Sequence, residues 1–193
     1  MLTPPAFFCR YRGRYVEATP THASLSAHVA QHVDSCGVAE VCPQYIFAER
    51  FRRADSEQLV GDEAGLSASP QWVGHVTEVR RQGGPQLFVG GRGSGAPMHF
   101  HSAAYNLLVY GRKRWFLQPP GHAKFSIRPA HEWVAERLPS LLAANETILQ
   151  CDQQSGDLFV LPDRWGHLTL NLETSVGFAQ EFTLQLPPDD PSL

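Results

Sequence analysis

Short apolar and aromatic runs separated by turn residues fill the chain from about residue 72 to residue 186. The runs lie at residues 72–79, 86–89, 105–110, 114–117, 157–161, 168–172 and 176–186. Gly, Pro, Asn and Asp lie between them, and short strands at this density are typical of a β-sandwich or a β-barrel. The sequence therefore predicts a mainly β fold.

One interruption of the β pattern is helical. Residues 130–144 place apolar side chains on one side of a helix, namely Trp133, Val134, Leu138, Leu141 and Leu142. Pro139 lies inside this repeat, and because its ring removes a backbone hydrogen bond, we expect the helix to break there.

The N-terminal part of the chain has a mixed pattern. We expect strands at residues 15–18 and 44–48, a helix over residues 24–33 and a loop over residues 54–70. A chain of 193 residues, 42% of them hydrophobic, is sufficient for one compact domain with a core.

We therefore predict a single domain over residues 1–193. Residues 1–70 form its mixed α/β support, residues 71–186 its barrel core and residues 187–193 a tail.

Charge and hydropathy narrow the partners. Lys and Arg number 16 against 19 Asp and Glu, the net charge is −3, and no basic run could follow a phosphate backbone, so nucleic acid is not expected. No apolar run approaches the roughly 20 residues that cross a bilayer, and residues 1–5 lack the features of a secretory leader. We expect a soluble chain without a membrane anchor, cytoplasmic if the sequence is complete and luminal if a leader precedes it; the oligomeric state stays open.

The chain has four cysteines, Cys9, Cys36, Cys42 and Cys151, without a CxxC pair. They are too sparse for a disulfide framework and wrongly spaced for a structural zinc site. A bridge between Cys36 and Cys42 and free buried thiols both remain open.

The strongest chemical signal is the pair His99 and His101. Histidines at positions i and i+2 of an extended segment project to the same face, so both imidazoles can reach one metal ion. A third ligand is available in His167, which follows the turn at residues 162–166 between two predicted strands. Three histidines leave open positions on an octahedral metal, but they suit Zn(II) and Ni(II) as well as Fe(II), so the ligands alone do not choose the metal.

Other motifs are less informative. The glycine-rich segment 90–95 lacks the Lys-Ser/Thr of a phosphate loop, and we interpret it as a flexible lead-in to the HxH segment. His28 and His32 have helical spacing but no accompanying carboxylate or Cys, which favours a solvated helix flank. His131 lacks the second histidine of a zinc protease motif and is interpreted as a helix start.

The chain resembles the JmjC domain of Fe(II)/2-oxoglutarate oxygenases. The resemblance rests on residues 98–101, 105–120, 162–167 and 171–172; it is specific over 87–120 and 155–182 and only suggestive before residue 86. The chain is most similar to the small JmjC-domain proteins of the endoplasmic reticulum lumen. The resemblance implies a double-stranded β-helix, the jelly-roll barrel of the cupins, with a few flanking α-helices.

The resemblance also implies roles for individual residues. His99 and His167 match the two histidines that bind iron in the family, and His101 stands where the family usually has Asp or Glu. Lys113, one of two lysines in the chain, matches the lysine that holds the distal carboxylate of 2-oxoglutarate, and Asn106 matches an asparagine that contacts this cosubstrate. A dianionic keto acid needs a fixed cation at one end and a metal at the other.

The chain departs from the family pattern at three positions. His101 removes one negative charge from the iron site, which puts turnover in doubt. Ala96 stands where many members have a hydroxyl residue beside the cosubstrate. Gly166 stands where an aromatic residue is common, which predicts a more open pocket wall.

We therefore expect a JmjC-type oxygenase in which His99, His101 and His167 hold Fe(II) and Lys113 and Asn106 hold 2-oxoglutarate. Its substrate would be a protein or a small molecule. Two alternatives stay open: a catalytically impaired JmjC-like protein that binds metal as a scaffold, and a three-histidine cupin dioxygenase that does not use 2-oxoglutarate.

Overall fold

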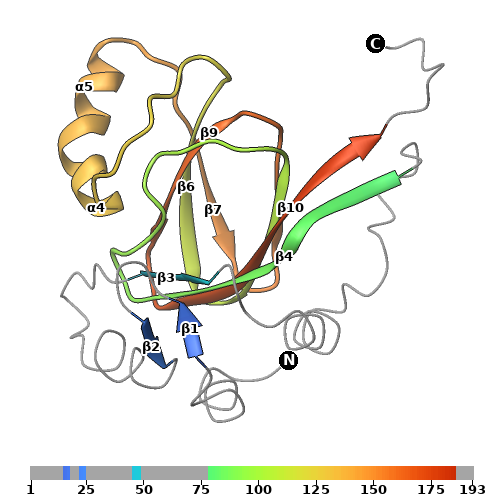
Figure 1. Cartoon of the computed structure of the whole chain (residues 1–193). Helices are drawn as coiled ribbons and strands as arrows, with labels where there is room; N and C mark the ends of the chain where they lie inside the picture. The colour runs from blue at the N-terminus through green and yellow to red at the C-terminus, as the bar shows by residue number, and fades with distance from the viewer. Residues whose placement is uncertain (1–14, 18–21, 25–44, 49–77, 186–193) are drawn as a thin grey trace.

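Two antiparallel sheets form the framework of the protein (Figure 1). The computed structural model describes residues 15–17, 22–24, 45–48 and 78–185. The larger sheet has the strand order β3 (Tyr45–Ala48), β4 (Glu78–Gly90), β10 (Ser175–Gln185), β5 (Ala104–Tyr110) and β8 (Leu158–Leu161). The smaller sheet has the order β7 (Leu149–Gln154), β6 (Arg112–Gln118) and β9 (Gly166–Asn171). A separate pair joins β1 (Tyr15–Glu17) to β2 (His22–Ser24).

Side chains between the two sheets form the interior of a barrel. Lys113 of β6 reaches across to the ring of Phe88 on β4, and the Gln153 side chain of β7 donates a hydrogen bond to the Asn106 carbonyl of β5. The mostly β structure with antiparallel sheets confirms the predicted jelly-roll fold class.

The long strand β4 corrects the prediction of separate strands at residues 72–79 and 86–89. Within the described residues, β4 continues without interruption from Glu78 to Gly90, through the turn-like residues 83–85. It pairs with β10 on both sides of a register shift, in which Ala179 lies opposite Gln86 and Glu181 lies opposite Gln82. Residues 83–85 therefore form a bulge within β4, where the sequence suggested a turn.

The helical segment also differs from the prediction. It comprises α4 (Ala130–Glu132), a π-helical turn η2 (Trp133–Arg137) and α5 (Leu138–Ala143) in direct succession. Pro139 does not break it, because the proline occupies the first turn of α5, where its missing N–H has little cost. Leu142 was expected on the buried side and is exposed.

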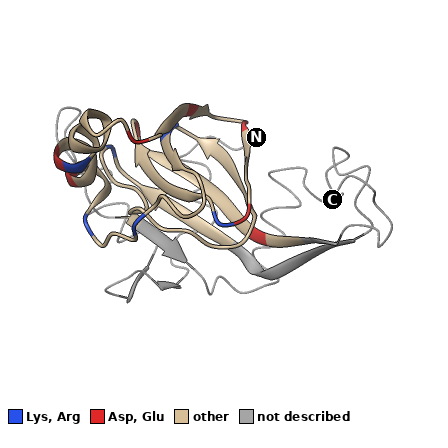
Figure 2. Ribbon diagram, turned by 90° about the horizontal axis from the view of Figure 1, so that it is seen from above, with Lys and Arg blue, Asp and Glu red and all other residues tan. Residues whose placement is uncertain are grey.

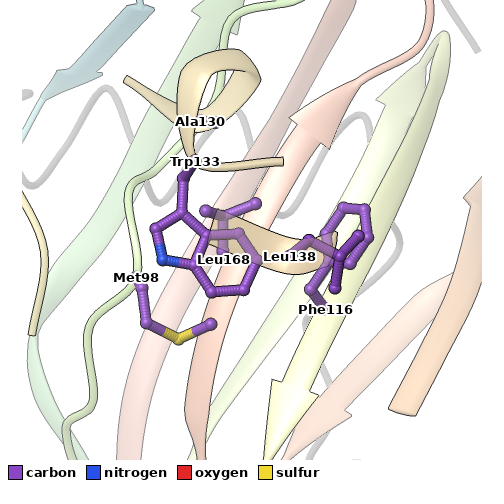
Figure 3. Close-up of a cluster of buried hydrophobic side chains, with 6 residues drawn as sticks. All are labelled: Met98, Phe116, Ala130, Trp133, Leu138 and Leu168. Carbon is purple, nitrogen blue, oxygen red and sulfur yellow. The ribbon is translucent and has the colours of Figure 1, made fainter. Parts of the chain in front are cut away.

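This helical segment covers the outer face of the smaller sheet. Trp133 and Leu138 pack with Phe116 of β6 and Leu168 of β9, and Met98 belongs to the same cluster (Figure 3). Trp115 and Phe116 both belong to the core: both are buried, and they lie in different clusters because successive strand residues face opposite sides.

Strand β7 was not predicted from the sequence. Its residues, LQCDQQ, are mostly polar, because β7 is an edge strand whose side chains are largely exposed. Apolar alternation, the signal used for the other strands, is therefore missing there.

Several predictions fall outside the described residues, namely the helix at 24–33 beyond Ser24, the loop at 54–70, the tail, and Cys9, Cys36 and Cys42. Cys151 is a free thiol. Among the described residues, no helix has the length and the apolar character that crossing a membrane requires. Basic and acidic residues lie side by side on the helical segment (Figure 2). Arg128, which precedes this segment, pairs with Glu136 within it.

Candidate metal centre

Three histidines from two separate segments meet at one place. His99 and His101 lie on the extended segment that precedes β5, and His167 lies on β9. The backbones of His99 and His167 form an antiparallel bridge, with N–H to carbonyl distances of 3.0 and 2.8 Å in the two directions. The candidate ligand atoms of the three side chains lie within 4.8 Å of one another, close enough to bind one ion.

Backbone carbonyls set the tautomer of each ring. The Nδ1 atoms of His99, His101 and His167 lie 2.7, 2.7 and 3.1 Å from the carbonyl oxygens of Pro97, Ser102 and Trp165. A carbonyl oxygen can only accept, so each neutral ring donates from Nδ1 and keeps its lone pair on Nε2. The structure thus orients three Nε2 atoms as free ligands, a feature typical of metal-binding histidines.

Burial keeps two of these imidazoles neutral. Burial lowers the pKa of His99, and it lowers the pKa of His167 well below the usual value. The pKa of His167 is lowered further by repulsion from any positive charge on His99 or His101. His167 is buried, whereas His99 and His101 are half-buried. Neutral imidazoles with a partly open side can accept a cation from solvent.

Lys113 lies fully buried in the barrel interior. Its Nζ atom lies 3.4 Å from the centroid of the Phe88 ring and 3.3 Å from the Tyr45 hydroxyl, to which it donates a hydrogen bond. No carboxylate of the described residues forms an ion pair with it. Burial lowers the pKa of Lys113 well below its usual value, since nothing near the amine offsets the loss of hydration.

The β6–β9 register separates the lysine from the histidines. Leu117 pairs with His167, and Lys113 pairs with Asn171 four residues further along. At about 3.3 Å per residue, the backbones of these two pairs lie about 13 Å apart along the strand. The imidazole ring and the long lysine side chain can both extend into this interval. The histidines and the amine thus lie at two levels of the same barrel.

Two buried amide oxygens also lack partners among the described residues. They are the Oδ1 atoms of Asn106 and Asn171. Asn171 uses its Nδ2 to donate a 2.9 Å hydrogen bond to Ser94 Oγ. Buried polar atoms without partners carry a free-energy cost, so these two acceptor oxygens are available to a bound hydrogen-bond donor.

The sequence reasoning did not identify Tyr45. This residue belongs to β3, far from Lys113 in the sequence, and it joins the lysine with a hydrogen bond while also bonding to the side chain of Thr169. Burial raises the pKa of Tyr45 above its usual value, so the phenol keeps its proton and can donate a hydrogen bond to a ligand. The aromatic residues at positions i and i+2 of this strand are typical of a buried strand face but do not predict the contact with Lys113.

Gly166 does not make the wall of the pocket more open, contrary to the prediction from its missing side chain. A Cβ atom at Gly166 would lie 2.0 Å from Cβ of Ala123 and 3.6 Å from Sδ of Met98. The connection after β6 fills the space that an aromatic side chain would occupy, and Trp165 packs into the cluster with Trp115 and Phe159.

The donor set fits a divalent transition metal. Three neutral imidazole Nε2 atoms suit Fe(II), Zn(II) or Ni(II) better than a hard cation such as Mg(II). The unpaired buried amine of Lys113, together with the Tyr45 hydroxyl, fits the carboxylate of an anionic organic ligand.

Comparison with known proteins points to one family, although no protein-family model matches the chain. Ninety residues are 43% identical to JmjC domain-containing protein 8 of Mus musculus, covering 46% of this chain and 33% of that protein. A stretch of 158 residues is 29% identical to Lysine-specific demethylase JMJ21 of Arabidopsis thaliana, covering 72% of this chain and 17% of that protein.

A further 103 residues are 27% identical to 2-oxoglutarate and iron-dependent oxygenase JMJD4 of Danio rerio, covering 47% of this chain and 24% of that protein. The matches thus span a third or less of the length of these relatives. In its antiparallel barrel, its cluster of His99, His101 and His167 and these sequence similarities, the chain is similar to proteins of the JmjC-domain family.

Proposed function

We propose that the protein is a JmjC-type non-haem Fe(II)/2-oxoglutarate-dependent oxygenase that hydroxylates a protein or small-molecule substrate. The observation that supports this most directly is that His99, His101 and His167 each donate from Nδ1 to a backbone carbonyl, with their ligand atoms within 4.8 Å. The sequence similarity to a 2-oxoglutarate and iron-dependent oxygenase adds the class of cosubstrate.

The residues of this chain would divide the work. His99, His101 and His167 would hold iron through Nε2, and the backbone carbonyls behind them keep the rings from turning. Lys113 and Asn106 would hold the keto acid; burial lowers the pKa of Lys113, and a dianion beside the amine would favour its ammonium form. Iron and the keto acid, when bound, would together supply the oxidation of a substrate C–H bond by dioxygen.

The lining of the barrel would limit access of water to the keto acid. Phe88 covers the amine with its ring face, and the fully buried Leu108 lies on the same face of the sheet, because both are paired with Gly177. In such a dry surrounding an ion pair between the Lys113 ammonium and a carboxylate is much stronger than in water.

Anaerobic titration tests this function. Purified protein with Fe(II) and 2-oxoglutarate should show a visible charge-transfer band and a keto-acid-dependent rise in unfolding temperature. The absence of both signals would reject 2-oxoglutarate as the cosubstrate. Lys113→Ala is the informative variant, since a three-histidine cupin dioxygenase that does not use 2-oxoglutarate would keep its activity in this variant.

His101 favours a second candidate, a JmjC-like protein that binds metal and acts as a scaffold without turnover. The ligand set of three imidazoles lacks the negative charge that a carboxylate would supply. This candidate predicts metal uptake without succinate formation, and succinate formation in His101→Asp alone. Steady succinate formation by the unmodified protein would exclude it.

A further inference from the structure

A carboxylate lies next to the three histidines without belonging to their cluster. Ser102, the residue that follows His101, donates a hydrogen bond of 2.6 Å from its hydroxyl to Oε2 of Glu181. Glu181 is half-buried on β10, in the larger sheet. This distance is at the short end of the range for hydrogen bonds between a hydroxyl and a carboxylate oxygen.

The pairing of β10 with β5 places Glu181 beside the segment that carries Ser102. Glu181 lies opposite Ala104 of β5, and the pairing is regular from Gly177 to Glu181. The next residue, Phe182, donates its backbone N–H to the Ala103 carbonyl at 2.8 Å. The regular register of the two strands therefore brings the carboxylate of Glu181 next to the residue that follows His101.

Ser102 connects this carboxylate to the ring of a histidine. Its carbonyl oxygen accepts the hydrogen bond from Nδ1 of His101, while its hydroxyl donates to Glu181. The negative charge is also felt at His99, whose pKa Glu181 raises, although burial, the largest effect, lowers it. One residue thus links the orientation of the His101 ring to a charge outside the cluster.

We propose that Glu181, held by Ser102, is a positioning residue of the metal centre that supplies the negative charge missing from the three-histidine ligand set. The inference rests on the proposed function in so far as the histidines bind a divalent cation. It explains how His101 can stand in place of a carboxylate ligand: the negative charge near the metal is supplied by Glu181 on a neighbouring strand instead of by a ligand. Carboxylates that support metal ligands from outside the coordination sphere commonly change metal affinity by one to two orders of magnitude.

The test is the affinity of the full chain for Co(II), measured by calorimetry and by the visible absorption of the bound ion. Glu181→Gln should raise Kd about tenfold, and Ser102→Ala should raise it severalfold because the carboxylate is no longer anchored. Glu181→Asp, which keeps the charge, should bind within about threefold of the wild type. The matched control is Glu173→Gln, which removes an exposed carboxylate paired with Arg112 and should change Kd less than twofold.

A second background tests the replacement of charge. In His101→Asp the ligand set has its own carboxylate, so Glu181→Gln should have a smaller effect there than in the wild type. Unchanged Co(II) affinity in Glu181→Gln, with a folded variant by thermal unfolding, overturns the inference while leaving the proposed function intact. If Glu181→Gln does not fold, unchanged affinity in Ser102→Ala overturns it instead. If the wild type binds neither Co(II) nor Fe(II), the proposed function fails, and this inference with it.

Discussion

The Nζ atom of Lys113 lies 3.4 Å from the centroid of the Phe88 ring, across the barrel from the strand on which the lysine lies. The aromatic face offers the amine a weak cation–π partner, and the Tyr45 hydroxyl offers a single hydrogen bond. Neither offsets the loss of hydration of a fully buried lysine. The lysine therefore lowers the stability of the protein without ligand, which is expected of a residue kept for binding rather than for packing.

Replacing this amine should separate stability from binding. Lys113→Met has a similar length and no charge, so we expect the free energy of unfolding to rise by about 1–2 kcal/mol. The same variant should lose the rise in unfolding temperature caused by 2-oxoglutarate. Lys124→Met, at an exposed position, is the control and should change neither quantity. A Lys113→Met protein that is less stable than the wild type would contradict this account of the burial.

Metal uptake should depend on the three histidines and not on others. His167→Ala removes the buried ligand, so we expect less than a tenth of the wild-type Co(II) content after loading and desalting. His122→Ala is the matched control, because His122 is exposed and pairs with Glu146. Metal content should be measured by elemental analysis, and equal loading of both variants would remove the histidine cluster as the site.

Metal affinity should resist acid more than three ordinary histidines would. With the usual pKa of about 6.5 for each, competition by protons would weaken binding about a thousandfold at pH 5.5. Burial lowers the pKa of His99 and that of His167, so both rings stay neutral below pH 6.5. We expect a much smaller loss in Co(II) titrations at pH 7.5, 6.5 and 5.5; a thousandfold loss would show that the two rings titrate normally.

The same lowered pKa values predict an acid-sensitive metal-free protein. In the unfolded chain His167 takes up a proton near pH 6.5, whereas in the folded protein it resists protonation. The unfolded state therefore binds more protons, and stability falls as the pH drops below 6.5. Unfolding temperatures from pH 7.5 to 5.5 should decrease, and Co(II) should reduce the decrease. His167→Gln should show a shallower dependence on pH.

The close contact behind the site offers a packing test. Gly166→Ala places a Cβ atom 2.0 Å from Cβ of Ala123, so one of the two segments must move. We expect a loss of about 1–3 kcal/mol in denaturant unfolding. The double variant Gly166→Ala with Ala123→Gly removes the clashing atom and should recover most of the loss. No loss in the single variant would show that the connection after β6 yields freely.

Local pattern was sufficient for much of the fold. Strands β5, β6, β9 and β10 follow from apolar runs because each buries at least one face. Edge strand β7 has no such signal, and the continuity of β4 through residues 83–85 depends on pairing with β10. The division of the chain into support, barrel and tail stays a prediction.

By itself the sequence determined the mainly β class and the shared face of His99 and His101, because side chains alternate along a strand with a period of two. It also limited the candidates for a cosubstrate-binding lysine to the two lysines of the chain. Only the tertiary structure decided that Lys113 is buried against Phe88 and Tyr45, that three carbonyls set the histidine tautomers, and that Glu181 meets Ser102. These contacts depend on strand order and register, which are set by hydrogen bonds between segments far apart in the chain.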